Sequence, residues 1–360
     1  MVFTGISGTP LHAARVADDP PRYREKDGLR LRKIAHLPME KARSIAFTEH
    51  HAWVGQNLVG MELLDIRNPS LPRRIKKFKP EEIQPLDIRV LDDDVLVIAD
   101  RFRGLVLWDV STPRTPVPLG SVKLPGIATS VDVTKVRGKR IAAVACGGEG
   151  MASVDITDPR RPVLLGLFQT RIDYSRRLVL DGNVAYLADH FDGGLKVLDL
   201  KNPSSPKPFF QVSIRGFCES VSRRGSLLAV GDRNYGFWLL EISSLSGEEN
   251  RDKQPTPVLR LQCNSVRTRS EVRDLLPIGD NLLLVANDVN GLELYDVSNR
   301  KFPLLLDEYE FGNAATAAQS VKTHSGHIYV PSWDGGLYIL RIVKESGFDD
   351  DDDSNTHEGP

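Results

Sequence analysis

The chain has 360 residues, of which 41% are hydrophobic and 26% are charged, so it can bury a core and stay in solution. Its 47 Lys and Arg residues are balanced by 48 Asp and Glu residues. This balance gives the whole chain no electrostatic footprint for nucleic acid or an anionic membrane, and no apolar run approaches the roughly 20 residues that cross a bilayer.

The N-terminus and the cysteines indicate a cytoplasmic protein. Residues 1–18 lack both a basic segment and a continuous apolar segment, so we expect no secretory signal. The three cysteines, Cys146, Cys218 and Cys263, are odd in number and widely spaced. This spacing fits neither a disulfide framework nor a metal knuckle, and we expect reduced thiols, no metal and no cofactor.

Ahead of any repeat, the chain has a segment without periodic apolar residues at 1–28 and a strand-like segment at 29–37. Seven copies of one pattern then follow: a glycine, a mostly apolar run and, in six copies, an acidic residue, as in Gly104-Leu-Val-Leu-Trp-Asp109. The glycines stand 42 to 55 residues apart, at positions 60, 104, 150, 194, 236, 291 and 336. So steady a period predicts a repeat architecture.

Each repeat contains four short runs with alternating or apolar residues. Turn sequences such as Asp181-Gly-Asn183 and pairs of prolines such as Pro159 and Pro162 separate these runs. Four antiparallel strands in about 44 residues are typical of one blade of a β-propeller.

The two ends of the repeat region predict how the ring closes. The last repeat ends near Val343 without a fourth strand, whereas 29–37 is a strand without a repeat. We therefore predict an all-β, seven-bladed propeller of four-stranded antiparallel blades at 29–344, in which the N-terminal strand completes the last blade and removes its free edge. Residues 1–28 and the acidic segment 345–360 are predicted to be flexible tails.

The repeated strand resembles the defining segment of the LVIVD-repeat family of β-propellers, as Leu195-Lys-Val-Leu-Asp199 illustrates. The resemblance covers about 29–344 and departs from the pattern at Glu241 and Arg341. It implies a propeller and no particular activity. Many similar proteins lie at bacterial or archaeal cell surfaces, so the resemblance leaves a cell-surface location open as the alternative to the cytoplasm. WD40 propellers are the competing family, but Trp-Asp ends a repeated strand only once, at Trp108-Asp109, and the Gly-His partner is missing from that repeat.

An aspartate ends the repeated strand in five of the seven copies, just before a turn. We interpret it as a cap whose carboxylate accepts N–H groups of that turn, not as a catalytic group. The series is Asp65, Asp109, Asp155, Asp199 and Asp296.

A second polar series is expected at one mouth of the central channel, where the second strands end and the inner strands begin. One hypothesis is a ligand or metal site; the alternative is that these side chains only cap turns. The residues of this candidate site are Asp87, Asp100, Asp189, His190, Asp232 and Asp274.

Arginines are concentrated in the inter-blade loops of repeats three to six. They predict a locally positive face that suits an acidic peptide or a phosphate-bearing partner, although Glu219 and Glu271 among them allow the alternative of scattered loop charge. The candidate partner-binding residues are Arg171, Arg176, Arg177, Arg215, Arg267, Arg269 and Arg273.

The common sequence signatures of enzymes are absent: there is no GxSxG, HExxH or phosphate-binding glycine loop. We therefore expect a non-enzymatic scaffold that binds a protein or peptide partner through its inter-blade loops, as a monomer or within a larger complex. The alternative is an enzyme, or a binder of metal or small ligands, that uses the acidic residues at the channel mouth.

Overall fold

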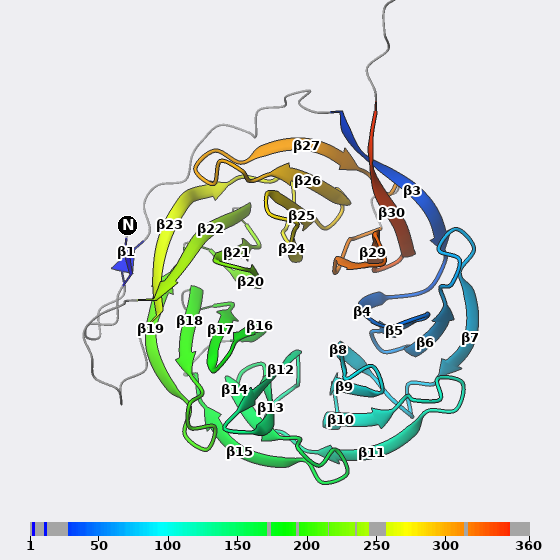
Figure 1. Ribbon diagram of the computed structural model, residues 1–360, viewed down its shortest axis with the longest axis vertical. Helices are drawn as coiled ribbons and strands as arrows, with labels where there is room; N and C mark the ends of the chain where they lie inside the picture. The colour runs from blue at the N-terminus through cyan, green and yellow to red at the C-terminus, as the bar shows by residue number, and fades with distance from the viewer. Residues whose placement is uncertain are drawn as a thin grey trace, which may run out of the picture.

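Seven β-sheets stand around one centre in this computed structural model (Figure 1). Each sheet has an inner strand beside the centre, two middle strands and an outer strand on the rim. The molecule is therefore a seven-bladed β-propeller, as predicted. The structure describes residues 2–3, 11–12, 28–170, 174–191, 194–214, 216–234, 236–244, 257–312 and 316–345.

The first four blades are consecutive in the chain, and their strands are given from the centre to the rim. Blade 1 has β4 (Ala42–Thr48), β5 (His51–Gln56), β6 (Gly60–Asp65) and β7 (Arg73–Phe78). Blade 2 has β8 (Pro85–Leu91), β9 (Val95–Asp100), β10 (Gly104–Asp109) and β11 (Val117–Val122). Blade 3 has β12 (Ser130–Val136), β13 (Lys139–Ala145), β14 (Met151–Asp155) and β15 (Val163–Phe168). Blade 4 has β16 (Ser175–Asp181), β17 (Val184–Asp189), β18 (Gly194–Asp199) and β19 (Lys207–Ser213).

The remaining three blades complete the ring. Blade 5 has β20 (Cys218–Arg224), β21 (Leu227–Asp232), β22 (Gly236–Ser244) and β23 (Pro257–Val266). Blade 6 has β24 (Asp274–Ile278), β25 (Leu282–Ala286), β26 (Leu292–Asp296) and β27 (Leu304–Tyr309). Blade 7 has β28 (Lys322–His324), β29 (His327–Ser332), β30 (Gly336–Lys344) and, on the rim, β3 (Leu29–Leu37).

The N-terminal strand closes the last blade, which confirms the prediction. β3 pairs antiparallel with β30, from Leu29 opposite Lys344 to Leu37 opposite Leu337. The pairing skips Ile34, just as the pairing of β6 with β7 skips Ile75 at the same place in blade 1. The N-terminal strand thus reproduces even the bulge of an ordinary outer strand.

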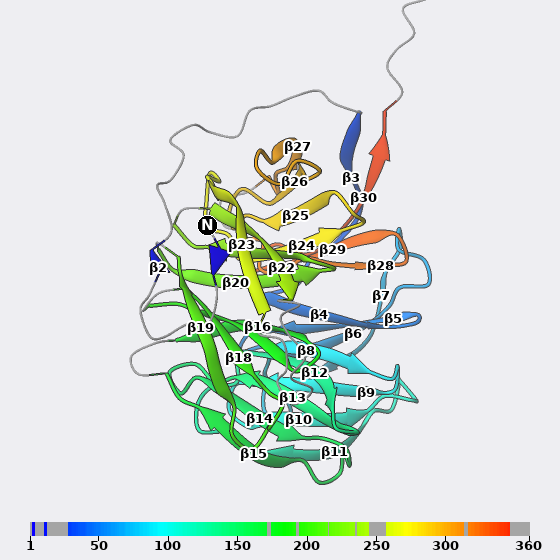
Figure 2. The ribbon, with the colours of Figure 1, turned by 60° about the vertical axis from the view of Figure 1, so that its left-hand side comes forward.

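The segment before β3 adds two short strands to the rim. β1 (Val2–Phe3) pairs antiparallel with β23, and β2 (Leu11–His12) pairs in parallel with β19 (Figures 1 and 2). The rest of residues 1–27 and residues 346–360 lie outside the described residues. The flexibility of the two tails stays a prediction.

The hydrophobic core is divided among the interfaces between neighbouring blades. Seven buried clusters each join one pair of adjacent blades, including blades 7 and 1, where Tyr329 and Ile339 pack with Ile45 and Val54. The middle strands lie between two such clusters, and β17 is buried at every position. This burial on both faces explains why the second and third runs of each repeat are almost continuously apolar.

The repeated aspartates cap turns, as predicted. In all five copies, carboxylate Oδ1 accepts the N–H of the residue two positions later, over 2.7 to 3.1 Å. The donors are the backbone amides of Arg67, Ser111, Thr157, Lys201 and Ser298.

The glycine at the start of the repeated strand is also required by the backbone. Gly194 has φ +103°, and a Cβ there would overlap the carbonyl oxygen of Val212 on the outer strand. A larger residue would have to displace the fourth strand of the blade, so glycine recurs at this position.

Removing one cap should destabilise the blade without unfolding it. We expect Asp199→Ala to lower the free energy of unfolding by roughly 0.5–2 kcal/mol, because the amide of Lys201 loses its acceptor. Asp199→Asn keeps a side-chain oxygen and should cost less. Chemical denaturation of the three proteins tests this, and an Asp199→Ala variant as stable as the wild type would contradict the capping role.

Removing the closing strand should be far more damaging. Deletion of residues 1–37 exposes the edge of β30 and removes Leu31, which is 5% exposed, from the core between blades 6 and 7. We expect a loss above about 4 kcal/mol, more than most single substitutions cause. Deletion of residues 1–27 is the matched control, since it leaves β3 in place. Equal thermal melting of the two truncated proteins would argue against closure by β3.

Candidate functional site

The turns and loops of the blades define two faces of the ring. Turns between second and third strands and the loops between blades lie on one face, here called the mouth face. The inner strands also begin there, whereas the turns capped by the repeated aspartates lie on the opposite face.

The centre of the mouth face is lined by the first residues of the inner strands. In blades 1, 2, 4 and 5 the pairing of the inner strand skips one residue, which is Arg43, Leu86, Arg176 or Glu219. A bulge of this kind re-aims the extra side chain. With their equivalents in the other blades they form the mouth ring: Arg43, Leu86, Thr129, Arg176, Glu219, Arg273 and Gln319.

Glu219 is the acidic centre of the mouth ring. Its carboxylate lies 3.4 Å from Arg176 Nε, 3.1 Å from His190 Nδ1 and 3.7 Å from Arg273 Nη1. Burial alone would raise the pKa of Glu219, but the contact with His190 and the charges of Arg176 and Arg273 outweigh it and hold the pKa below its ordinary value. Glu219 is therefore an ionised hub for side chains of blades 4, 5 and 6.

Arg273 is fully engaged by acids. Its Nη2 lies 2.6 Å from Glu271 Oε2, and its Nε donates to Asp288 Oδ1 over 2.9 Å. Glu271 also pairs with Arg233 over 2.8 Å. On the side of blades 5 and 6, the cations of the mouth face are thus balanced by carboxylates.

Asp87 and Asp274 directly follow two members of the mouth ring, Leu86 and Arg273. They also lie at the centre of the ring, one residue further along the inner strand. Asp274 Oδ2 accepts from Ser320 Oγ over 2.7 Å and from Val321 N over 3.1 Å, both in the next blade. Asp87 makes the same two contacts with Ser130 and Val131, over 2.9 and 3.1 Å. These carboxylates satisfy the free edge of the neighbouring inner strand and so join adjacent blades.

Three cations neutralise these two buried acids. Arg89 Nη1 lies 3.1 Å from Asp87, and both Arg177 Nη2 and Lys322 Nζ lie within 3.7 Å of Asp274. Burial would raise the pKa of each carboxyl. The positive charges of Arg177 and Lys322 lower the pKa of both acids, and Arg89 also lowers that of Asp87. The acids are therefore ionised and engaged in ion pairs.

The other acids of the predicted site do not converge with these two. Asp100 accepts from the backbone amides of Gln84, Phe102 and Arg103, and Asp232 accepts from those of Phe217 and Asn234. Both carboxylates are buried in their own turns. Asp189 pairs with Lys196 of the adjacent strand. The candidate catalytic or ligand-binding acids are thus used by the blades themselves.

The predicted arginine patch is divided in three. Arg176, Arg177 and Arg273 lie at the centre of the mouth face, in the ion pairs described above. Arg269 pairs with Glu308 over 3.0 Å near the rim, and Arg267 is exposed. Arg171 and Arg215 lie outside the described residues.

An aromatic group beside Glu219 was missed by the sequence analysis. His190 stacks on Phe217 with ring centroids 4.8 Å apart, and Phe191 meets both rings edge-on. Arg176 lies over the ring of Tyr174 at 5.0 Å. We call Tyr174, Arg176, His190, Phe191 and Phe217 the aromatic patch; its members come from three separate stretches of sequence.

Exposed apolar side chains recur in the turn that follows the second strand. Phe191 is 59% exposed, and Leu58, Phe102 and Val289 occupy the same turn in blades 1, 2 and 6, with 49%, 65% and 43% exposed. The signal was available in the sequence as a large apolar residue two or three positions after the second strand, in a turn where polar residues are expected.

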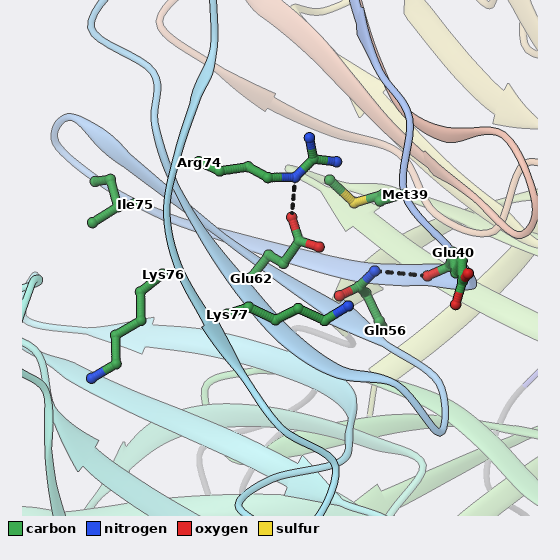
Figure 3. Close-up of a pocket in the computed structure, with 8 residues that line it drawn as sticks. All are labelled: Met39, Glu40, Gln56, Glu62, Arg74, Ile75, Lys76 and Lys77. Atoms are coloured by element: carbon green, nitrogen blue, oxygen red, sulfur yellow. Dashed lines mark hydrogen bonds and ion pairs between the residues drawn. The ribbon is translucent and has the colours of Figure 1, made fainter.

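A pocket of about 430 Å³ lies at the outer part of blade 1 (Figure 3). Arg74 donates to Glu62 over 2.8 Å, and Gln56 donates to the backbone oxygen of Glu40. Figure 3 shows Lys77 beside these groups, whereas Lys76 points away. Three of its polar side chains, those of Arg74, Glu62 and Gln56, thus already have hydrogen-bond partners.

Two further observations concern metals and membranes. Among the described residues, no group of three or more His, Cys, Asp and Glu side chains is arranged to hold a metal ion. The same part of the chain contains no helix with the length and hydrophobicity that a membrane span requires.

Comparison with known proteins supports the fold and the repeat. Two crystal structures are similar to this chain in fold at 12% identity: the computationally designed Ika8 protein, with a TM-score of 0.60, and the Cps50 (Swd1) β-propeller domain of Myceliophteria thermophila, with a TM-score of 0.67. Each alignment covers 86% of this chain and 98% or more of the other. A comparison with curated proteins gave no match.

The class defined by the fold is thus the seven-bladed β-propeller. Residues 173–213, which include all of blade 4, match the family model of the LVIVD repeat. The chain is therefore a seven-bladed β-propeller with an LVIVD repeat in blade 4, and its other blades have the same four-stranded plan.

Among the described residues, no cation contacts Glu293, a buried acid near the mouth face. Glu293 is 2% exposed and accepts from Asn287 Nδ2 over 2.7 Å and Tyr295 OH over 2.9 Å. Burial, the largest cause, raises the pKa of Glu293 to about 7. The equivalent Glu62 of blade 1 instead meets Arg74.

This raised pKa predicts a dependence of stability on pH. The folded state holds the proton of Glu293 more tightly than the unfolded chain, so its contribution is complete below pH 4.5 and is lost as pH rises toward 7. Glu293→Gln should remove that loss. The free energy of unfolding of the variant, relative to that of the wild type, should therefore rise by about 2 kcal/mol from pH 5 to pH 8. Urea denaturation at both pH values tests this. Glu49→Gln, at a carboxylate that is 85% exposed, is the control, and equal pH profiles for all three proteins would contradict the prediction.

Proposed function

We propose that this protein is a non-enzymatic binding module that holds a protein or peptide partner on its mouth face. The observation that carries the proposal is the aromatic patch, where the exposed ring of Phe191 lies beside His190, Phe217 and the charged centre. Hot spots of protein interfaces are enriched in aromatic residues and arginine, and this patch contains both.

The chemistry of the face also indicates the chemistry of the partner. Phe191 offers apolar contact area, and Arg176 and Arg43 of the mouth ring offer positive charge within the same region. A polypeptide with an apolar side chain close to an acidic one would match both features. This proposal keeps the acidic partner expected from the arginines and moves its centre from the loops toward the axis of the ring.

The cytoplasm is the compartment that we propose. Cys146 and Cys218 are buried free thiols, and burial raises the pKa of the Cys146 thiol to about 12. Thiols of this kind are unreactive packing groups and fit a reducing environment.

The test begins with identification of a partner by affinity capture from the native host and mass spectrometry. The purified partner is then titrated against the wild type, Phe191→Ala and Phe302→Ala. Phe302 is the matched control, because it is 75% exposed but lies in a turn of the opposite face. We expect Phe191→Ala to weaken binding by roughly tenfold or more, as the loss of a hot-spot aromatic does, and Phe302→Ala to leave it unchanged.

A different pattern would place the interface elsewhere. If Phe302→Ala weakens binding and Phe191→Ala does not, the partner binds the opposite face. If neither variant changes the affinity, the aromatic patch is not the interface and the proposal fails.

A further inference from the structure

Positive charge is concentrated around Arg43 of blade 1, in the mouth ring. Among the described residues Arg43 makes no hydrogen bond or ion pair, although its neighbours include Arg101, Arg176 and Arg177. Glu219 is the acid whose charge favours the ionised form of Arg43. Three neighbouring guanidinium groups thus repel Arg43, and one neighbouring carboxylate offsets part of that repulsion.

That carboxylate is already shared by other groups. Glu219 lies within 3.7 Å of Arg176, His190 and Arg273. Arg177 is turned toward Asp274, 3.6 Å away. Both acids are thus already paired with other cations.

Donor groups in this cluster also lack acceptors. Arg101 donates through Nη2 to the amide oxygen of Asn57 over 3.0 Å, but its buried Nε has no hydrogen-bond partner. Arg176 Nε is buried without a hydrogen bond and has only the 3.4 Å ion pair to Glu219. Buried donors without acceptors are costly, and guanidinium donors are matched best by oxyanions.

The electrostatics of Arg43 agree with this geometry. Burial is the main cause that lowers the pKa of Arg43 to about 10, and the charges of Arg176, Arg177 and Arg101 lower it further against the opposing effect of Glu219. A bound anion would offset both the burial and the repulsion.

We propose that Arg43, Arg101 and Arg176 form an oxyanion-binding site at the centre of the mouth face, which accepts a carboxylate or a phosphate group. The three residues come from blades 1, 2 and 4, so the ring must be closed for the site to exist. The inference deepens the proposed function, because an acidic group of the partner would occupy this site. It is tested without any partner.

The experiment measures thermal unfolding of the full chain in sodium glutarate, in sodium phosphate and in potassium chloride at matched ionic strength. The proteins are the wild type, Arg43→Gln and Arg160→Gln, which changes an exposed arginine on the opposite face. We expect glutarate, phosphate or both to raise the melting temperature of the wild type and of Arg160→Gln above the value in chloride. Titration of the effective anion should show at least about tenfold weaker binding to Arg43→Gln, because a charge-assisted hydrogen bond is lost.

The stability of Arg43→Gln in chloride separates this role from a structural one. We expect this variant to be at least as stable as the wild type, since a repelled charge is removed. The anion that stabilises only the proteins with Arg43 identifies the ligand as a carboxylate or a phosphate. A wild type that neither anion stabilises beyond chloride, or an Arg43→Gln variant with the full response, overturns the proposal whatever happens at Phe191.

Discussion

The pairing of β3 with β30 is the constraint on which the rest of the molecule depends. Each blade buries its two faces only because another blade lies on either side, and a ring of seven therefore needs all seven interfaces. The N-terminal strand supplies the outer strand of blade 7 in register, including the bulge at Ile34. Residues that are most distant in sequence thus complete two of the seven cores, those on either side of blade 7.

Closure also decides the chemistry of the centre. Each inner strand is an edge of its sheet. Its N–H groups that face the channel pair with no further strand of that sheet and must find other acceptors. Asp87 and Asp274 fill this need for the blades that follow them, and cations from other blades then balance their charge. The polar centre is therefore part of the joint between blades. Arg43 differs, because it has no ion-pair partner among the described residues.

The sequence was sufficient to predict features that repeat along it. Seven glycines, the capping aspartates and one unpaired strand defined the number of blades, their turns and their closure, since each depends on local pattern or on counting. The site depends on contacts across the ring. The grouping of His190 with Phe217 and Glu219, or of Arg43 with Arg176, follows from bulges that shift single residues between strands, and pattern alone does not reveal these. Leu58, Phe102 and Val289 were detectable in principle, but apolar turn residues were passed over in favour of charged ones.

The direction of the two strands that close the ring has a practical consequence. β30 runs away from the mouth face and β3 starts opposite its end, where the amide of Glu345 donates to the oxygen of Gly28 over 2.7 Å. Gly28 and Glu345 therefore both lie on the side of the opposite face, as the adjoining ends of β3 and β30 in Figure 2 illustrate. An attachment at these two positions would therefore hold the ring by its opposite face and leave the aromatic patch and Arg43 facing solution.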